Sequence, residues 1–372
     1  MFRHVPIFAA LFACFGGFFA GAAEKCDGPE AVCRFAPYVM KLEGNRREAN
    51  AVYLGVGLAA ANRHVVLGRP DLIVKTGDGR TFGAKVKPSG YKGDLALLAV
   101  ADLNLGGGPV LAESLTSGTG LFVMAHEPNV VGPRIYPPGE VLLPPAVGYV
   151  LSRLQHNARG GEASEGGAIL TRDGRLAGIA TVGYGDRGEA IPAAQIRALI
   201  ELSKGEATQT KHKLTDAYIR CMDAQRRMPI RRARLARRAV TYLSEHCTRT
   251  QNGQLIESAA RILGRAGHLA EARDLFSVVL GMDPHTLGAR QGLVVVLLLG
   301  GGHEAAIPHL KWLFDILPRD LEILRLSIQA GKYAGDIAFA EAAYARLLQL
   351  NPALALPMRR FLDGSEIGGK AR

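Results

Sequence analysis

The chain has 372 residues, of which 48% are hydrophobic, so it is too long for one small domain and apolar enough to bury two cores. Its 45 Lys and Arg outnumber 34 Asp and Glu, which gives a formal net charge of +11. Its cysteines form no Cys-x-x-Cys pair and its histidines show no ligand spacing, which argues against a zinc site. We expect neither a metal nor a cofactor.

Residues 1–23 have the order of a secretory signal peptide. A short charged start precedes an apolar run from Val5 to Ala20, and small residues follow. Cleavage after Ala22 or Ala23 predicts a mature chain in the periplasm or outside the cell. The alternative is an uncleaved membrane anchor, although glycines interrupt the run and it is short for a bilayer span.

The mature chain would keep four cysteines: Cys26, Cys33, Cys221 and Cys247. An even number in an oxidising compartment favours disulfides. Proximity in the sequence favours Cys26 with Cys33 and Cys221 with Cys247. Three pairings are compatible with four cysteines, and free buried thiols remain the alternative.

From about residue 35 to 200 the sequence is rich in glycine, with short β-branched runs between turn signals. This pattern is typical of an all-β barrel. The strands are expected at 38–43, 51–54, 71–75, 81–86, 121–124, 149–154 and 176–182. The Asp78-Gly79 step predicts a hairpin between the third and fourth of them.

Three segments in this region carry residues that suit serine-protease chemistry. Residues 62–66 read Asn-Arg-His-Val-Val and contain His64, whereas residues 93–98 read Gly-Asp-Leu-Ala-Leu-Leu and contain Asp94 (94 − 64 = 30). Residues 155–170 read Gln-His-Asn-Ala-Arg-Gly-Gly-Glu-Ala-Ser-Glu-Gly-Gly-Ala-Ile-Leu. In their order and flanks these segments resemble the histidine, aspartate and nucleophile segments of trypsin-like serine proteases of the HtrA type.

The resemblance continues beyond the third segment, through Asp-Gly-Arg-Leu-Ala-Gly-Ile at 173–179 and Glu-Ala-Ile-Pro at 189–192. It implies a trypsin-like double β-barrel over residues 24–203, with His64 as the base and Asp94 as the carboxylate that orients it. Taken singly, each residue also has a plain structural explanation, as a histidine at a strand end and an aspartate in a turn.

The register of the third segment decides the activity. Counted from either side of the loop, the nucleophile position holds Glu165, with Gly166 after it and Ala163 in place of the glycine that helps to form the oxyanion hole. A carboxylate that attacked an amide would give an anhydride-like intermediate that reverts. We therefore expect a catalytically silent domain in which Asp94, His64 and Glu165 form a structural or pH-responsive cluster.

Ser164 provides the alternative. A shift of one residue in the loop would make Ser164 the nucleophile, with His64 and Asp94, in an active serine endopeptidase. Both registers lose a glycine that suits the turn, and the loss of one oxyanion donor typically slows such enzymes by on the order of 100-fold or more.

Beyond residue 203 glycine becomes rarer and apolar residues recur at helical spacing. We expect a linker at 204–213 and a helical cap at 214–250. Seven arginines occur from Arg226 to Arg238, and positions 227, 231, 234 and 238 would share one face of a continuous helix. This face is either simply solvated or contacts anionic lipid or an acidic partner; nucleic acid is not expected for an exported chain.

Three landmarks then recur at one constant interval (318 − 284 = 34 and 352 − 318 = 34 for the prolines). They are Gly267, Gly301 and Gly335; Ala272, Ala306 and Ala340; and Pro284, Pro318 and Pro352. The period and these residue types resemble those of tetratricopeptide repeats, which implies three repeats over residues 251–355, followed by a tail at 356–372.

Together these features predict a trypsin-like double β-barrel followed by an α-helical, tetratricopeptide-type solenoid. A silent protease-like cleft and a concave helical surface indicate a binding or scaffold protein of the cell envelope that takes peptide or protein ligands. In a simpler account the repeats alone carry the function and the barrel is only structural. The sequence does not indicate an oligomeric state.

Overall fold

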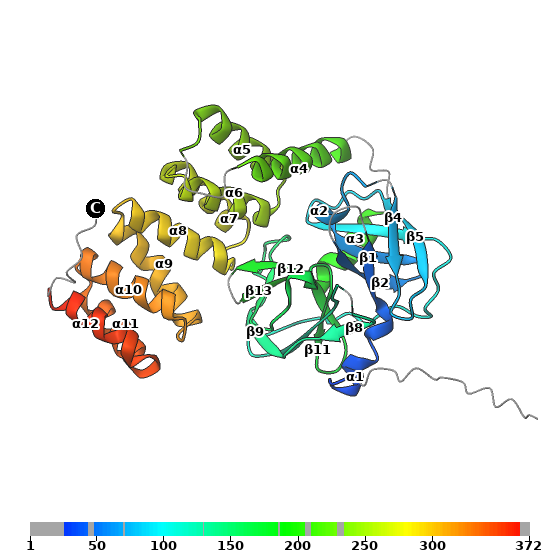
Figure 1. Ribbon diagram of the computed structural model, residues 1–372, viewed down its shortest axis with the longest axis horizontal. Helices are drawn as coiled ribbons and strands as arrows, with labels where there is room; N and C mark the ends of the chain where they lie inside the picture. The colour runs from blue at the N-terminus through cyan, green and yellow to red at the C-terminus, as the bar shows by residue number, and fades with distance from the viewer. Residues whose placement is uncertain are drawn as a thin grey trace, which may run out of the picture.

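The computed structural model describes residues 26–43, 48–69, 71–128, 130–184, 187–204, 210–228 and 234–364. The expected signal peptide, residues 205–209 of the expected linker, Arg231, Arg232 and residues 365–372 lie outside these ranges. Figure 1 shows a β-structured half beside a curved array of helices. None of the helices in these ranges has the length and hydropathy that crossing a bilayer requires.

The first barrel follows a short helix, α1 (Glu30–Cys33), and a 3-10 turn, η1 (Ala36–Tyr38). Its strands are β1 (Val39–Glu43), β2 (Ala49–Gly55), β3 (Leu58–Asn62), β4 (Leu72–Lys75), β5 (Thr81–Lys87) and β6 (Leu95–Val100), closed in the order β1-β2-β3-β6-β5-β4. Met40, Leu42 and Leu98 fill its interior with no exposed surface. The predicted hairpin joins β4 and β5, with Gly79 at a φ of 86°.

The second barrel closes through the order β11-β12-β13-β10-β9-β7, because β11 also pairs with β7. Its strands are β7 (Gly120–His126), β8 (Pro133–Ile135), β9 (Gly139–Leu143), β10 (Leu154–His156), β11 (Ala168–Thr171), β12 (Leu176–Tyr184) and β13 (Arg187–Pro192). Strand β8 extends the sheet outside the ring, beside β7. Helix α3 (Ala193–Leu202) then packs Ile196 and Leu199 into the core between the barrels.

The strand expected at 149–154 is wrong. Residues 150 and 151 form a turn, none of residues 149–153 is in a strand, and β10 begins only at Leu154. Tyr149 and Val150 are 42% and 86% exposed, so their β propensity has no sheet face to pack against. The buried Ser152 hydroxyl instead accepts a hydrogen bond from Ala146 N at 2.7 Å, which fixes the loop.

The helical part continues from α4 to α12 within the described residues. Its helices are α4 (Thr210–Arg227), α5 (Arg237–Arg249), α6 (Gly253–Arg265), α7 (Leu269–Met282), α8 (Leu287–Leu299), α9 (His303–Ile316), α10 (Leu321–Ala334), α11 (Ile337–Leu350) and α12 (Pro352–Leu362). The starts of α6, α8 and α10 are separated by the same interval as the sequence landmarks (287 − 253 = 34, 321 − 287 = 34). The period read from the sequence is therefore that of three successive helical hairpins. The chain beyond residue 355 continues as α12, and α4 begins inside the range expected to be a linker.

The recurring residues occupy equivalent places in the three hairpins. Each glycine lies in the turn between the two helices, at a φ of 77–84°, a conformation that side chains other than glycine rarely adopt. Each alanine is fully buried on the second helix, and each proline follows two residues after the end of that helix. Small residues thus let the paired helices approach, while proline prevents the second helix from continuing.

Both cysteine pairs favoured by proximity are bonded. Cys26 and Cys33 have an S–S distance of 2.08 Å, and Cys221 and Cys247 one of 2.10 Å. The second disulfide joins α4 to α5, so these helices form a cross-linked hairpin at the start of the array.

Arg227, Arg234 and Arg238 do not lie on one continuous helix as expected, and Arg231 lies outside the described residues. Helix α4 ends at Arg227 and α5 begins at Arg237. Proline disfavours helical geometry at the residue before it, which agrees with the end of α4 just before Met228, the residue that precedes Pro229 in the sequence.

The second barrel and the helical array are joined by buried polar contacts. The Asp283 carboxylate accepts hydrogen bonds from Ser152 Oγ at 2.8 Å and from Arg153 N at 2.9 Å. Arg187 of β13 forms an ion pair with Asp320 at 3.1 Å. The residues just before α8 and α10 therefore hold the helical array against the second barrel, which also carries the loop of Glu165 (Figure 1).

Candidate active site

His64 and Asp94 meet because β3 and β6 are paired. Asn62, the last residue of β3, lies opposite Leu95, the first of β6. His64 follows β3 in a single helical turn, α2 (Arg63–Val66), and Asp94 directly precedes β6. His64 N donates to Asp94 Oδ1 at 3.1 Å, while Nδ1 lies 2.7 Å from Asp94 Oδ2. One carboxylate thus fixes both the backbone and the ring of His64.

Glu165 reaches the same point from the second barrel. It follows a 3-10 turn, η2 (Glu162–Ser164), in the loop before β11. Asn50 of β2 holds this loop: its backbone N donates to Glu165 O at 2.9 Å, and its side-chain Nδ2 donates to Ala163 O at 2.7 Å. The first barrel therefore positions the loop of the second.

Gly166 is a steric requirement of this loop. Its φ is +79°, and a Cβ at this position would lie 2.1 Å from Asn50 O. No other residue fits without displacing the loop. This glycine supports the register that places Glu165, and not Ser164, next to the histidine.

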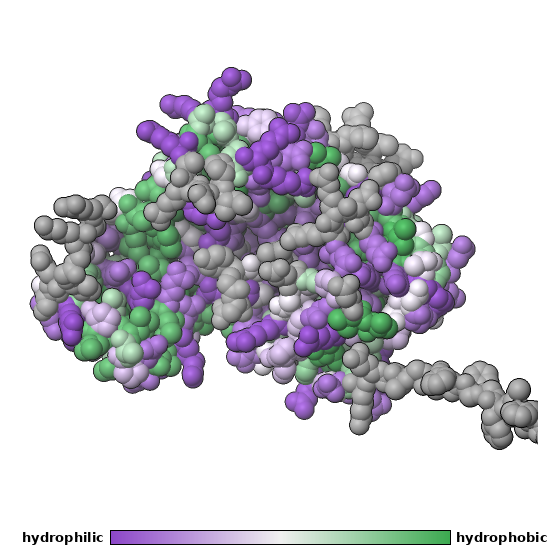
Figure 2. Space-filling model, viewed as in Figure 1, coloured by the Kyte–Doolittle hydropathy of each residue, from purple (hydrophilic) through white to green (hydrophobic). Residues whose placement is uncertain are grey.

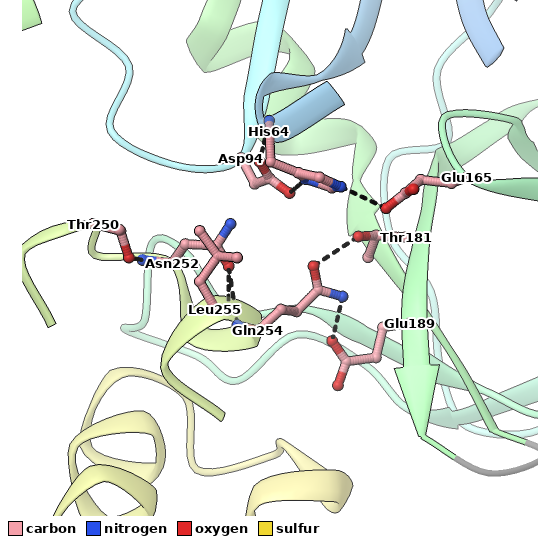
Figure 3. A network of polar contacts seen from close by, with 9 residues as sticks. All are labelled: His64, Asp94, Glu165, Thr181, Glu189, Thr250, Asn252, Gln254 and Leu255. Carbon is pink, nitrogen blue, oxygen red and sulfur yellow. Dashed lines mark hydrogen bonds and ion pairs between the residues drawn. The ribbon is translucent and has the colours of Figure 1, made fainter. Parts of the chain in front are cut away.

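The His64 imidazole is bound on both of its nitrogens by carboxylates. Nε2 lies 2.6 Å from Glu165 Oε1, opposite the 2.7 Å contact between Nδ1 and Asp94 (Figure 3). The side chain of His64 is only 14% exposed, that of Glu165 6%, and that of Asp94 is fully buried. Hydrogen bonds of this length between charged groups are among the strong ones in proteins.

This environment favours imidazolium. Burial lowers the pKa of His64, but the charges and hydrogen bonds of Asp94 and Glu165 outweigh burial and raise the pKa to about 10. For Asp94, burial opposes ionisation, yet the charge of His64 holds the pKa of the carboxyl below its usual range. At neutral pH His64 is therefore protonated and has no lone pair with which to act as a base.

Ser164 lies beside this cluster without joining it. Within the described part of the chain, no hydrogen bond connects the Ser164 hydroxyl to His64. Its Oγ instead faces Gly160. The two residues are so close that a Cβ added at Gly160 would lie 2.6 Å from this Oγ. The amides of Ser164, Gly166 and Gly167 donate to Gly161 O, Ala180 O and Ser164 O, so the loop uses them for its own folding.

A buried aromatic layer supports the turn that carries His64. The Arg63 guanidinium lies over the rings of Tyr91 and Tyr218, at 5.8 and 5.9 Å from their centroids, and donates to Tyr91 O. Tyr218 belongs to α4, so the helical part contributes directly to the support of the site. Sequence reasoning missed Asn50, Arg63 and Tyr218, because a lone polar or aromatic residue in a periodic segment carries no spacing signal.

Helix α6, the first helix of the three hairpins, contacts strands β12 and β13 near the site. Thr181 of β12 donates to Gln254 Oε1 at 2.8 Å, and Gln254 Nε2 lies 3.4 Å from Glu189 Oε2 (Figure 3). Burial, followed by the charge of Glu257, raises the pKa of Glu189 to about 7. A buried pair of carboxyl groups thus lies between β13 and α6.

A groove of about 910 Å³ opens beside this contact. Helices α6, α7 and α8 supply most of its wall, the barrel adds Gly183 and Glu189, and Arg234 and Glu322 complete it. The wall combines apolar side chains such as Phe276 and Leu299 with the charged Arg261 and Arg265. Its volume lies in the range of sites that bind ligands.

The other predicted residues lie elsewhere. Both disulfides and the three sets of landmark residues belong to the framework, and the described arginines of the stretch from 226 to 238 lie at the end of α4, at the start of α5 and just before α5. The candidate site therefore consists of His64, Asp94 and Glu165, with Asn50 and Gly166 shaping the loop.

Protein-family models give no match to this chain, and neither do curated proteins. Among solved structures, the chain is similar to an inactive serine-to-alanine mutant of Rv3671c from M. tuberculosis H37Rv, with 19% identity and a TM-score of 0.42 over 49% of this chain and 94% of the other. It is also similar to the serine endoprotease from Yersinia pestis, with 26% identity and a TM-score of 0.41 over 46% of this chain and 65% of the other. A third similar structure is the HtrA-type protease AlgW with a tripeptide, with 25% identity and a TM-score of 0.40 over 46% of this chain and 61% of the other.

Proposed function

We propose that the barrel domain is a catalytically silent homologue of trypsin-like proteases and that the protein binds peptides or proteins without cleaving them. The observation that carries this proposal is the position of Glu165. Its carboxylate occupies the side of His64 where a nucleophilic hydroxyl would have to lie, at 2.6 Å from Nε2. Proteolysis by a serine needs that hydroxyl and a neutral imidazole, and this geometry supports neither.

The groove supports the binding half of the proposal. It faces both the barrel and the first helices of the hairpins, which we interpret as tetratricopeptide-type repeats. An extended peptide fits such a groove through apolar contacts along its length and through charged contacts with the arginines. The protease-like cleft and the repeats would then act as one binding surface in a scaffold protein.

The disulfides support a setting in the cell envelope. Two bonded pairs persist only in an oxidising compartment, which agrees with the signal peptide expected at residues 1–23. We therefore place the mature protein in the periplasm or outside the cell.

Incubation of the mature protein with a peptide library tests both halves. Mass spectrometry should find the library intact, and immobilised protein should retain a subset of peptides. Leu299→Glu should weaken this retention by about tenfold or more, since Leu299 lines the groove and is 65% exposed. Leu356→Glu is the matched control, because Leu356 of α12 is 58% exposed and lies outside the groove.

Cleavage that both His64→Ala and Ser164→Ala abolish would show an endopeptidase that uses Ser164. Equal loss of retention in the two leucine variants would instead remove the groove from the proposal.

A further inference from the structure

The hairpin of α4 and α5 holds most of the net positive charge of the chain. Residues 210–250 contain 11 Lys and Arg but only 3 Asp and Glu, an excess of 8, whereas the whole chain has +11. Figure 2 shows hydrophilic side chains gathered over α4 and α5 at the top of the view. The charge is thus concentrated on one element and not spread over the surface.

Four exposed arginines, at the end of α4, just before α5 and at the start of α5, lack an ion-pair partner among the described residues. They are Arg227, Arg234, Arg237 and Arg238. Within the described ranges no carboxylate lies at ion-pair distance from any of them, whereas Arg220, Arg226 and Arg249 are paired with Asp216, Asp223 and Glu245. We refer to the four unpaired arginines as the arginine cluster.

Helix stability does not account for the arginine cluster. Arg237 and Arg238 occupy the first turn of α5, where the helix dipole favours acidic residues, and no acidic residue is present in that turn. Like charges this close repel each other at low salt. Their concentration therefore costs stability that an anionic partner would recover.

Each of the two helices also exposes a large side chain with apolar surface. Ile219 of α4 is 40% exposed and Tyr242 of α5 is 42% exposed. Tyr242 follows Arg238 by four residues, so both lie on the same face of α5. Arginine combined with exposed tyrosine and aliphatic side chains is typical of surfaces that rest at the headgroup level of a membrane.

We propose that the arginine cluster and its apolar neighbours bind the surface of a membrane that contains anionic phospholipid. This inference is independent of the silent protease site, because none of these residues contacts His64, Asp94 or Glu165, although Arg234 also lines the groove. The hairpin would hold the barrel and the groove at the membrane surface, and its disulfide would keep the two helices together during binding.

Co-sedimentation of the full mature chain with vesicles tests this proposal. Vesicles of phosphatidylcholine with about one third phosphatidylglycerol should bind the protein, whereas pure phosphatidylcholine should not. The quadruple variant Arg227→Gln, Arg234→Gln, Arg237→Gln, Arg238→Gln should lose on the order of several hundredfold in partition coefficient, at about fivefold per arginine. Binding of the wild type should also weaken steeply between about 0.05 and 0.5 M NaCl, roughly the range over which the Debye length falls from more than 10 Å to a few Å.

A matched control separates position from total charge. Arg172, Arg197, Arg325 and Arg346 are also exposed and unpaired within the described residues. Their change to Gln removes the same charge and should lower the partition coefficient less than about tenfold. Thermal unfolding of both quadruple variants should occur at or above the wild-type temperature, because the arginine cluster repels itself in the wild type, and this shows that each variant is folded.

Three outcomes would overturn the proposal. One is equal binding of the wild type to vesicles with and without phosphatidylglycerol, and another is an equal loss in the two quadruple variants. The third is binding of poly-L-glutamate through the arginine cluster with no binding of anionic vesicles, which would point to an acidic protein partner.

Discussion

The change Glu165→Gln tests how much the second carboxylate contributes to the fold. A glutamine keeps the shape of the side chain but removes the charge that faces the imidazolium. The 2.6 Å contact joins two groups that are 14% and 6% exposed, so a charge-assisted bond of about 1.5–3 kcal/mol is expected. We predict a loss of about 2 kcal/mol in the unfolding free energy of the barrel at pH 7.

The pH dependence of this loss identifies its origin. The pKa of His64 is raised to about 10, so the stability that its charge supplies is complete below pH 6.5 and disappears as the pH rises through about 10. The whole change corresponds to about 5 kcal/mol, shared between Asp94 and Glu165. At pH 11 the wild type and Glu165→Gln should therefore differ by less than about 0.5 kcal/mol.

Urea unfolding followed by pulsed hydrogen exchange is the suitable assay, because it reports barrel peptides separately from the helical array. Glu127→Gln is the control, since the Glu127–Arg134 pair belongs to the same barrel but is 25% and 58% exposed and should contribute less than about 1 kcal/mol. A loss for Glu165→Gln that is below about 0.5 kcal/mol at pH 7, or that persists unchanged at pH 11, would refute the reasoning.

Three further predictions concern the framework of the site and of the array. Gly166→Ala should destabilise the barrel by about 3 kcal/mol or prevent folding, because the new Cβ would meet Asn50 O. Gly79→Ala has a similar φ but open space around the Cβ and should cost only about 1 kcal/mol, as thermal unfolding of the two variants would show. The double change Cys221→Ala, Cys247→Ala opens a loop of 26 residues and should cost about 3–4 kcal/mol, visible as faster hydrogen exchange in α4 and α5. The folded-state pKa of Glu189 is raised to about 7, so ionisation of this buried carboxyl lowers the stability of the fold as the pH rises from about 4.5 through 7. Glu189→Gln should therefore stabilise the protein by about 1–3 kcal/mol at pH 8 and by almost nothing at pH 4, as measured by urea unfolding.

The parts of the fold that depend on local pattern could be predicted from the sequence. The Asp78-Gly79 hairpin follows from the backbone freedom of glycine, and the period of the helical array follows from the turn glycine, the small alanine and the proline of each hairpin. The flanks of His64 and Asp94 also place these residues at paired strand ends. In each case the determining interactions lie close together in the sequence, or repeat at a fixed spacing.

The parts that depend on distant contacts could not be predicted. Asn50 holds the loop of Glu165 across 115 residues, yet it is one polar residue in an ordinary strand. Asp283 joins the array to the second barrel, and nothing in the turn that contains it signals this role. Tyr149 and Val150 misled the strand prediction, because β propensity does not reveal whether a sheet face is available.

The end of α4 at Arg227 is a different case, since the sequence contains its cause in Pro229. Proline disfavours helical geometry at the preceding residue, and that local rule takes precedence over the spacing of the arginines around it.

Reaction with a fluorophosphonate, read by the intact mass of the mature protein, tests the central claim most directly. Such reagents phosphonylate a serine only when a neutral imidazole activates it. With His64 bound between two carboxylates, we predict no mass increase in the wild type, while Glu165→Ser, which places a hydroxyl against a released imidazole, should be labelled slowly and lose the label when combined with His64→Ala. A stoichiometric adduct on Ser164 of the wild type that His64→Ala prevents would contradict the claim.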